Sequence, residues 1–221
     1  MQNDFNPENL DFNPSTLLFI STLLKINCGV IVIYKYIAKK LSKLLKEADI
    51  IKDDQEIYEY GFELVLSFIT GCALILCISL IVNRFLEGIF FLAAFISIRS
   101  FTGGYHATSH LKCNLCLCLV YLIYCVLTNH CNVEFMLTLE IMSWGAIYII
   151  VMHAPLANAK KNISDIEKKI FKVKARKITL FFKLLSFIFT LICTKLYCVI
   201  TYTLIAVGLM MLISIGGDKN E

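Results

Sequence analysis

Long apolar segments recur along the chain and constrain its fold more than any other feature. Hydrophobic residues make up 58% of the 221 residues, charged residues only 17%, and the mean hydropathy is +0.72. Soluble domains average about 45–50% apolar and about 25% charged residues. An apolar run of about 18 or more residues with few charges is long enough to cross a bilayer as a helix. The composition therefore predicts an all-α integral membrane protein whose partner is the lipid bilayer and not nucleic acid.

Six segments are predicted to span the membrane. They are residues 62–82, 86–98, 115–127, 135–152, 180–194 and 196–215. The second and third are short for a full crossing, and each either extends into the polar stretch between them or leaves part of the site below the headgroups. A 3.6-residue period is hard to see in these segments, as expected for helices that are apolar on all sides. The predicted fold is a bundle of about six spanning helices.

A basic amphipathic segment precedes these spans. After an interrupted apolar stretch at 17–34, tyrosine, isoleucine and leucine recur at roughly helical spacing against five lysines between residues 35 and 46. Such a helix suits a membrane surface, and a solvated helix face is the plainer alternative. Residues 17–34 either span the membrane or lie in its interface, which we favour. We therefore expect a single domain, 1–221, with an amphipathic interfacial region (1–60) and a transmembrane core (61–221).

Lysine and arginine cluster in alternate connections between the predicted spans. Six lie in residues 35–52 and eight in the predicted loop 154–178, whereas the other connections hold Arg84 alone, none, and Lys195 alone. Short cytoplasmic loops are enriched in basic residues. Six crossings then place both basic regions, the stretch 99–113 and the C-terminus in the cytoplasm, although one wrong span would break this agreement. We expect a multi-pass protein of the cell membrane.

The polar stretch RSFTGGYHATSHLKCNLC, Arg99–Cys116, holds two glycines, two histidines and two cysteines between two apolar spans. His106 and Cys113 are seven residues apart, which is about 10.5 Å along a straight helix. Direct hydrogen bonding needs roughly 2.6–3.2 Å, and somewhat more to sulfur. A catalytic pair therefore requires a break in the helix, and Gly103 and Gly104 permit the backbone angles for one.

A new helix that begins near Ser109 would place Cys113 in its first turns, and Thr108 and Ser109 are good N-cap residues. The helix dipole and the free N–H groups favour a thiolate there. A Cys–His pair supports nucleophilic chemistry, in which the thiolate attacks a carbonyl and the imidazole transfers the proton. Because residues 88–133 contain no Asp or Glu, any orienting third group would be neutral: Thr102, Ser109 or Asn114.

Two other interpretations fit the same residues. His106, His110, Cys113 and Cys116 have the spacing H-x3-H-x2-C-x2-C, and histidine and cysteine at such intervals can bind zinc. Against zinc, Cys116 begins an apolar span, and no carboxylate or second ligand cluster lies nearby in the sequence. The stretch can also be a plain polar turn between membrane helices. Spacing alone leaves the catalytic pair, the metal site and the polar turn open.

The stretch resembles the signature of the AgrB family (accessory gene regulator protein B), which are bacterial membrane cysteine peptidases of quorum-sensing systems. The residues that carry the resemblance are Arg99, Gly104, His106, Ala107, Ser109 and Cys113. A second segment, HAPLANAKKNISDIEKK from His153, resembles the family's Ala-Pro segment and the basic loop after it. The resemblance runs from about Tyr60 to the C-terminus.

The resemblance implies a hydrolase of the thiol protease class with peptide-cyclising activity. Cys113, assisted by His106, would cleave the C-terminal tail from a small propeptide of the AgrD type and retain an acyl-thioester. An internal cysteine or serine of the peptide would then close a thiolactone or lactone ring, the autoinducing peptide of quorum sensing and virulence. The resemblance also implies a homodimer in the bacterial cell membrane. We expect no cofactor or metal, and the distribution of basic residues predicts an active site on the cytoplasmic side.

Further residues are expected to bind the substrate: Arg99, Gly103, Gly104, Ser109, Lys160 and Lys161. Arg99 can instead be an interfacial anchor, because an unpaired charge at the end of a span is expensive. The basic residues 160–177 can attract an acidic propeptide tail, or they can reflect membrane topology alone. The alternative of a different class is a non-enzymatic membrane transporter or a metal-binding membrane protein.

Overall fold

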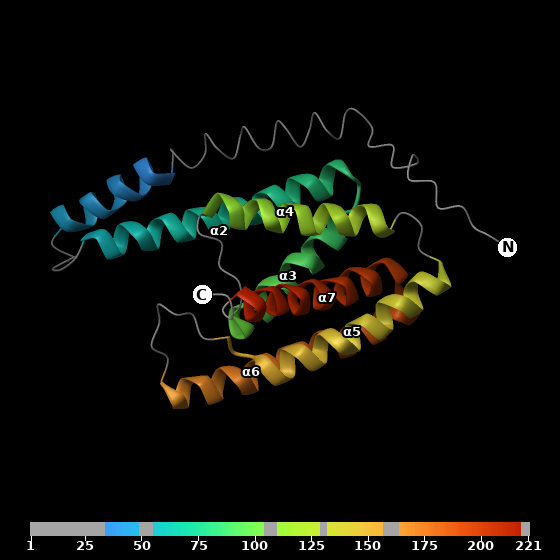
Figure 1. Ribbon diagram of the computed structural model, residues 1–221. Helices are drawn as coiled ribbons and strands as arrows, with labels where there is room; N and C mark the ends of the chain where they lie inside the picture. The colour runs from blue at the N-terminus through green and yellow to red at the C-terminus, as the bar shows by residue number, and fades with distance from the viewer. Residues whose placement is uncertain (1–33, 49–54, 104–109, 129–131, 157–163, 218–221) are drawn as a thin grey trace. The chain divides into compact units, whose positions relative to one another are not determined.

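The computed structural model describes residues 34–48, 55–103, 110–128, 132–156 and 164–217, without the side chains of 110–112 and 217. All regular structure in these ranges is helical (Figure 1), which confirms the all-α prediction. A first helix covers residues 34–47. Six longer helices follow: α2 (Gln55–Ile81), α3 (Phe85–Thr102), α4 (His110–Leu127), α5 (Val133–His153), α6 (Asp165–Ile192) and α7 (Thr194–Gly217). Each predicted span corresponds to one of these six.

Four of the helices, α2, α3, α5 and α7, are long and apolar enough to cross a membrane. The described apolar part of α4, Cys113–Leu127, is shorter than these four helices. In α6 the first half is strongly basic, and the second half is apolar. The structure therefore fits a helical membrane bundle, and the number of crossings stays a prediction.

The ends of α5 follow from its sequence. Asn132 caps the first turn, where its side-chain oxygen accepts a hydrogen bond from the Phe135 backbone N–H at 2.9 Å. The helix ends at His153, immediately before Ala154 and Pro155. Proline has no N–H with which to continue the helix, so this end lies where the sequence predicts it.

The predicted loop 154–178 is largely wrong, because α6 already begins at Asp165. Ser164 and Glu167 form a capping box: Ser164 Oγ accepts from the Glu167 N–H at 3.3 Å, and Glu167 Oε2 accepts from the Ser164 N–H at 3.0 Å. These bonds satisfy two backbone donors that a helix start leaves open. The basic residues 168–177 therefore lie on a helix that continues directly into the apolar segment.

The chain divides into two compact units, residues 1–69 with 109–111, and residues 70–108 with 112–221. In the first unit, Tyr34, Ala38 and Ser42 form a buried stripe along the helix 34–47. Gln55 Nε2 donates to Ser42 Oγ at 3.3 Å. The apolar residues of the predicted amphipathic face are exposed, namely Tyr36, Ile37, Leu41 and Leu44. They leave an apolar surface beside the lysines, and its contact with a membrane stays a prediction.

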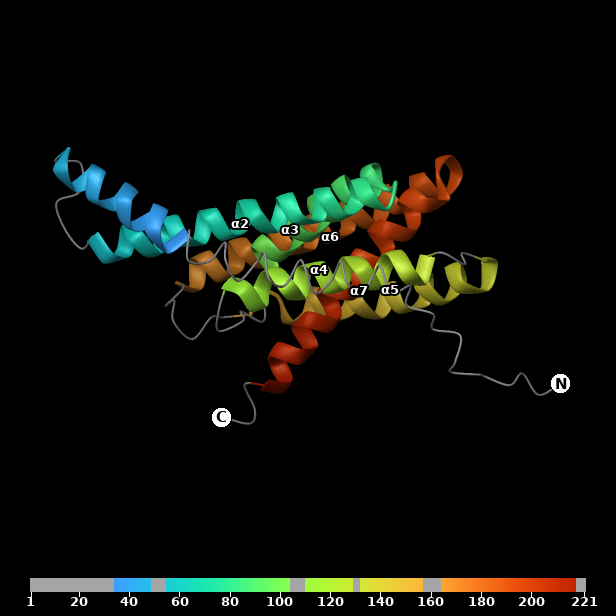
Figure 2. The ribbon, with the colours of Figure 1, turned by 90° about the horizontal axis from the view of Figure 1, so that it is seen from above.

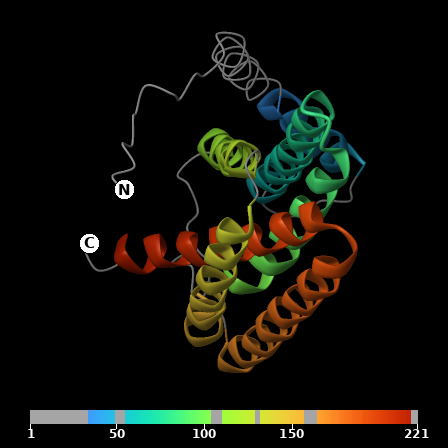
Figure 3. The ribbon, with the colours of Figure 1, turned by 90° about the vertical axis from the view of Figure 1, so that its right-hand side faces the viewer.

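In the second unit, α7 contacts α3, α5 and α6, and it crosses α5 at an angle (Figures 2 and 3). The crossing is close, because a Cβ added to Gly208 would lie 2.7 Å from the Cβ of Ala146 on α5. Helix α7 contributes more of the large, fully buried side chains than any other helix: Val199, Ile200, Leu204, Val207 and Met211. Helix α7 is therefore the central element of the second unit.

A polar cluster joins α5, α6 and α7 inside this unit. Lys183 Nζ on α6 lies 2.6 Å from Glu140 Oε2 and 2.8 Å from Ser143 Oγ, both on α5. The Tyr197 hydroxyl on α7 donates to the same Glu140 oxygen at 3.0 Å. A charge among apolar helices is costly unless it is paired. The Lys183–Glu140 pair therefore joins α6 to α5, and the Tyr197 hydrogen bond adds α7 to the same cluster.

Candidate functional site

The site begins where α3 ends, at Gly103. This residue has φ of +67°, and a Cβ added to it would lie 2.6 Å from the Leu156 carbonyl oxygen. The Leu156 N–H donates to the Thr102 carbonyl at 2.9 Å. Both the left-handed backbone and the close approach require glycine. The segment after α5 therefore packs directly on the last turn of α3, just before the residues that carry the histidine motif.

The helix break that a catalytic pair requires is present. Helix α3 ends at Thr102 and α4 begins at His110, so the stretch between Arg99 and Cys113 is not one straight helix. As predicted, Cys113 lies in the first turn of α4. His106 lies outside the described residues, so its position relative to the Cys113 thiol stays a prediction.

Cys113 differs from the other cysteines of α4. Cys113 is exposed, Cys116 is half-buried, and Cys118 and Cys125 are buried. Its neighbour Asn114 is buried, and a Cβ added to Gly71 on α2 would lie 2.8 Å from the Asn114 side-chain oxygen. Helix α4 therefore turns Asn114 toward α2 and leaves the Cys113 thiol accessible at the positive end of the helix dipole.

Arg99 lies on the last full turn of α3, on the side that faces α7. Its Nη1 donates to Met210 Sδ at 3.0 Å, and its guanidinium carbon lies 5.6 Å from the centre of the Phe95 ring. The guanidinium is therefore held between α3 and α7.

The basic half of α6 packs on the same end of the bundle. The Nε and Nη2 atoms of Arg176 both donate to the Val151 carbonyl, near the end of α5, at 3.3 Å. Lys174 Nζ lies 5.5 Å from the centre of the Phe101 ring near the end of α3, and this ring contacts Phe171. Cationic groups thus gather at the ends of α3 and α5, where an acidic peptide would be attracted.

Comparison with known protein families assigns the chain to a family. The family model described as accessory gene regulator B matches residues 33–215, which is most of the chain. The chain belongs to the AgrB family. Neither a curated protein nor a solved structure matches it.

AgrB membership gives the protein a role in the accessory gene regulator system of quorum sensing, with a small propeptide of that system as its substrate. The family is linked to peptidase-like processing of this propeptide. Together with the four helices that can cross a bilayer, membership also identifies a membrane protein.

The residues predicted for the AgrB site divide into two groups. The structure describes Cys113, Arg99 and Gly103, and it brings Gly103 against Leu156 and Arg99 against Met210 on α7. The others lie outside the described residues: Gly104, His106, Ser109, Lys160 and Lys161. Among the possible third groups, Thr102 is buried, and its hydroxyl donates to the Gly103 carbonyl at 3.3 Å.

The zinc interpretation depends partly on residues that the structure does not describe. In the described part of the chain, no group of three histidine, cysteine, aspartate or glutamate residues can hold a metal ion. His106 and the side chain of His110 fall outside that search.

Sequence reasoning missed two contacts at this end, between Gly103 and Leu156 and between Arg176 and Val151. Pro155, which ends α5, was the only sequence signal near them.

Proposed function

We propose that this AgrB-family protein is a membrane cysteine endopeptidase with Cys113 as its nucleophile and His106 as its acid–base partner. One observation carries the proposal: Cys113 is the exposed thiol of α4 and lies in the first turn after the helix break. A nucleophile must be accessible to the peptide, and the helix dipole favours negative charge on its sulfur. Arg99, in the last turn of α3, supplies the positive charge of the proposed site.

In the first step, the Cys113 thiolate attacks the carbonyl carbon of the scissile peptide bond of the propeptide. The carbonyl oxygen takes up negative charge, and Arg99 or backbone N–H groups of the α4 start can stabilise it. When the C–N bond breaks, His106 gives its proton to the leaving amine. The C-terminal tail departs, and the remaining peptide is held as an acyl-thioester on Cys113.

In the second step, a thiol or hydroxyl within the bound peptide attacks the thioester carbonyl. His106 accepts the proton of this group, the Cys113 sulfur leaves as a thiolate, and a thiolactone or lactone ring forms. Exchange of one thioester for another is nearly neutral in energy, so the intermediate conserves the energy for ring closure. Water must be kept away from the thioester in the meantime, and a site at the membrane edge favours this.

The basic residues supply the recognition of the substrate in this proposal. Arg99 binds a carbonyl or carboxylate near the scissile bond, and Gly104 and Ser109 contribute to substrate binding in this proposal. The basic residues of α6, with Lys160 and Lys161 before it, attract an acidic propeptide tail. The enrichment of lysine and arginine in 35–52 and 160–177 supports a cytoplasmic site. The homodimer rests on the family resemblance.

The test is co-expression with the cognate propeptide, using Cys113→Ala, His106→Ala and the matched control Cys116→Ala. We expect the first two variants to reach the membrane at normal levels and to leave the propeptide uncleaved. Cys116→Ala should retain cleavage, because its half-buried thiol lies one turn away from the exposed one. Persistent cleavage by membrane-inserted Cys113→Ala contradicts the proposal.

Loss of activity in Cys116→Ala as complete as in Cys113→Ala would favour the metal-binding alternative. That alternative predicts one zinc per chain, which falls when Cys116 or His110 is replaced. A non-enzymatic transporter predicts no cleavage by the wild type.

A further inference from the structure

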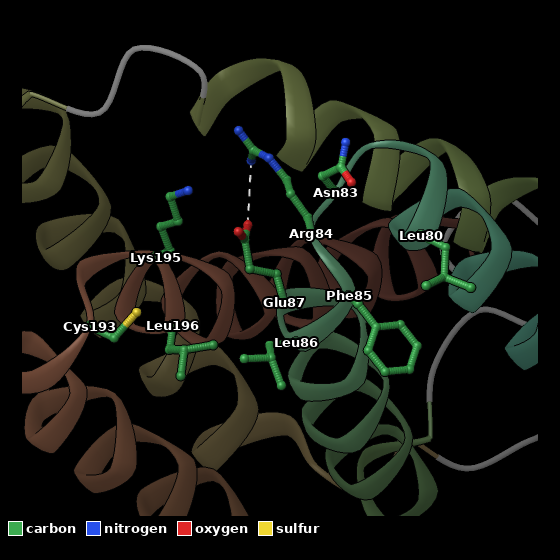
Figure 4. Close-up of a pocket in the computed structure, with 9 residues that line it drawn as sticks. All are labelled: Leu80, Asn83, Arg84, Phe85, Leu86, Glu87, Cys193, Lys195 and Leu196. Carbon is green, nitrogen blue, oxygen red and sulfur yellow. Dashed lines mark hydrogen bonds and ion pairs between the residues drawn. The ribbon is translucent and has the colours of Figure 1, made fainter.

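A pocket of about 400 Å³ lies at the end of α3 that is remote from Gly103 (Figure 4). Its walls come from the turn between α2 and α3 and from the turn between α6 and α7. Helix α3 has 18 residues and is therefore about 27 Å long. The pocket is thus separated from the Gly103 end by about the thickness of the apolar part of a bilayer.

Three charged side chains line this pocket. Arg84 Nη1 lies 3.4 Å from Glu87 Oε2, and the Glu87 side chain is only 6% exposed. The Tyr124 hydroxyl donates to the same Glu87 oxygen. The charges of Arg84 and Glu87 therefore compensate each other within the wall of the pocket.

The third charge, Lys195, is not compensated in this way. Its side chain is exposed, and its ammonium group has no hydrogen-bond or ion-pair partner among the described residues. Two positive charges and one negative charge leave the pocket with a net charge of +1. This sign favours an anionic ligand, which would pair with the Lys195 ammonium group.

Apart from Asn83, the rest of the lining is uncharged and mostly apolar, and part of it faces outward. Leu80, Phe85 and Leu86 are 58%, 42% and 62% exposed, and in a membrane protein such surfaces contact acyl chains. Figure 4 shows the charged ends of Arg84, Glu87 and Lys195 together on one side of the pocket, with the apolar side chains on the other. A ligand that matches both sides has an anionic head and an apolar body.

We propose that this pocket binds the phosphate of an anionic phospholipid. Lys195 pairs with the phosphate, and the first part of an acyl chain lies against Leu80, Phe85 and Leu86. A volume of about 400 Å³ is at the low end for small-molecule sites and suits a lipid headgroup better than a folded peptide. A zwitterionic lipid carries its own positive group beside the phosphate, so it competes poorly for Lys195.

The test uses Cys193, which lines the pocket, as a reporter in the full-length protein. The protein is placed in nanodiscs of phosphatidylcholine, with or without phosphatidylglycerol, and the rate of Cys193 alkylation by a small neutral maleimide is read by peptide mass spectrometry. Bound lipid should cover the thiol, so phosphatidylglycerol should slow its alkylation at least about fivefold, as expected for a site that is about 80% occupied.

Variants connect this protection with the pocket. Lys195→Gln should reduce the slowing to less than about twofold, and Lys195→Arg should restore it, because arginine keeps the charge. The matched control is Lys168→Gln on the exposed basic half of α6, which changes the net charge equally and should retain the full slowing. This control also accounts for the negative surface potential of the nanodisc.

Three results would overturn the inference. One is equal slowing in Lys195→Gln and Lys168→Gln, which would mean that the lipid acts through surface charge alone. Another is no slowing in the wild type. The third is protection by inorganic phosphate in phosphatidylcholine nanodiscs without protection by phosphatidylglycerol, which would identify a site for soluble anions. Because the experiment measures alkylation of Cys193 and not propeptide cleavage, its outcome does not depend on the proposed peptidase activity.

Discussion

Each end of α3 carries an arginine, Arg84 or Arg99, and the surroundings of the two guanidinium groups differ. At the Arg84 end, a buried carboxylate three residues away and the Tyr124 ring surround the guanidinium. At the Arg99 end, the guanidinium contacts a methionine sulfur and a phenylalanine ring, and residues 88–133 contain no acid. A charge near a membrane is costly unless it is compensated or needed for function. The comparison indicates that Arg84 is held in an ion pair with Glu87, whereas Arg99 contacts the sulfur of Met210 and the ring of Phe95.

Exchanging each arginine for glutamine tests this comparison with the largest expected effects. Arg84→Gln leaves the Glu87 carboxylate buried without its ion-pair partner and should lower the free energy of unfolding by about 3 kcal/mol. Arg99→Gln should lower the rate of propeptide cleavage per folded molecule about 100-fold, as for the loss of one donor to a developing oxyanion. Thermal unfolding in detergent and cleavage per folded molecule measure the two effects. The opposite pattern would reverse the assignment.

The Lys183–Glu140 pair extends the comparison, because it belongs to the half of the second unit nearer to Arg84. Lys183→Met removes the cation that lies 2.6 Å from Glu140 and should lower the free energy of unfolding by about 2–3 kcal/mol. The cost is below the maximum because Tyr197 and Trp144 still donate to the carboxylate. Lys177→Met, at an exposed position on the same helix, serves as the control. Equal losses in the free energy of unfolding for Lys183→Met and Lys177→Met would contradict a structural role for the pair.

The Gly103 turn tests the comparison between the two ends of α3 at the Arg99 end. Gly103→Ala forces a Cβ to within 2.6 Å of the Leu156 carbonyl in a left-handed backbone and should cost about 1–2 kcal/mol. It should also slow cleavage, because the residues that carry His106 follow directly. Gly145→Ala is the matched control, since nothing lies within 4 Å of its added Cβ. This control should be neutral or stabilise α5 by up to about 1 kcal/mol. Unchanged cleavage in Gly103→Ala would separate this turn from the site.

The smallest expected effect concerns the start of α6. Ser164→Ala removes the capping box and should lower helix stability by about 0.5–1 kcal/mol. The basic half of α6 should then fray, which would be detected as faster hydrogen exchange at residues 165–170 with the apolar half unchanged. Uniform exchange along the whole helix would mean that packing, and not the cap, sets where α6 begins.

Hydropathy predicted the helices about equally well at both ends of α3, the one with Arg84 and the one with Arg99. Apolar length and composition are local properties, so each of the six spans corresponds to a helix, and Pro155 marks the end of α5. The Ser164–Glu167 pattern also predicts a helix start, but the basic residues after it favoured a loop in the sequence interpretation.

The contacts between helices could not be predicted in this way. The approach of Leu156 to Gly103, the Lys183–Glu140 pair and the Arg84–Glu87–Tyr124 cluster join residues from different helices. Such contacts depend on how helices pack, and hydropathy does not encode this. The family motif predicts Cys113 as the nucleophile, and the structure adds that its thiol is the exposed one on α4.

The central claim, that Cys113 carries the peptide as a thioester, can be measured directly. The purified protein in liposomes is mixed with a propeptide whose ring-forming cysteine or serine is replaced by alanine, so that the second step is blocked. Intact mass spectrometry should show the protein plus the tail-less peptide, attached at Cys113 and removed by neutral hydroxylamine. Release of the tail without any such adduct on Cys113, or an adduct that persists in Cys113→Ala, would contradict the account.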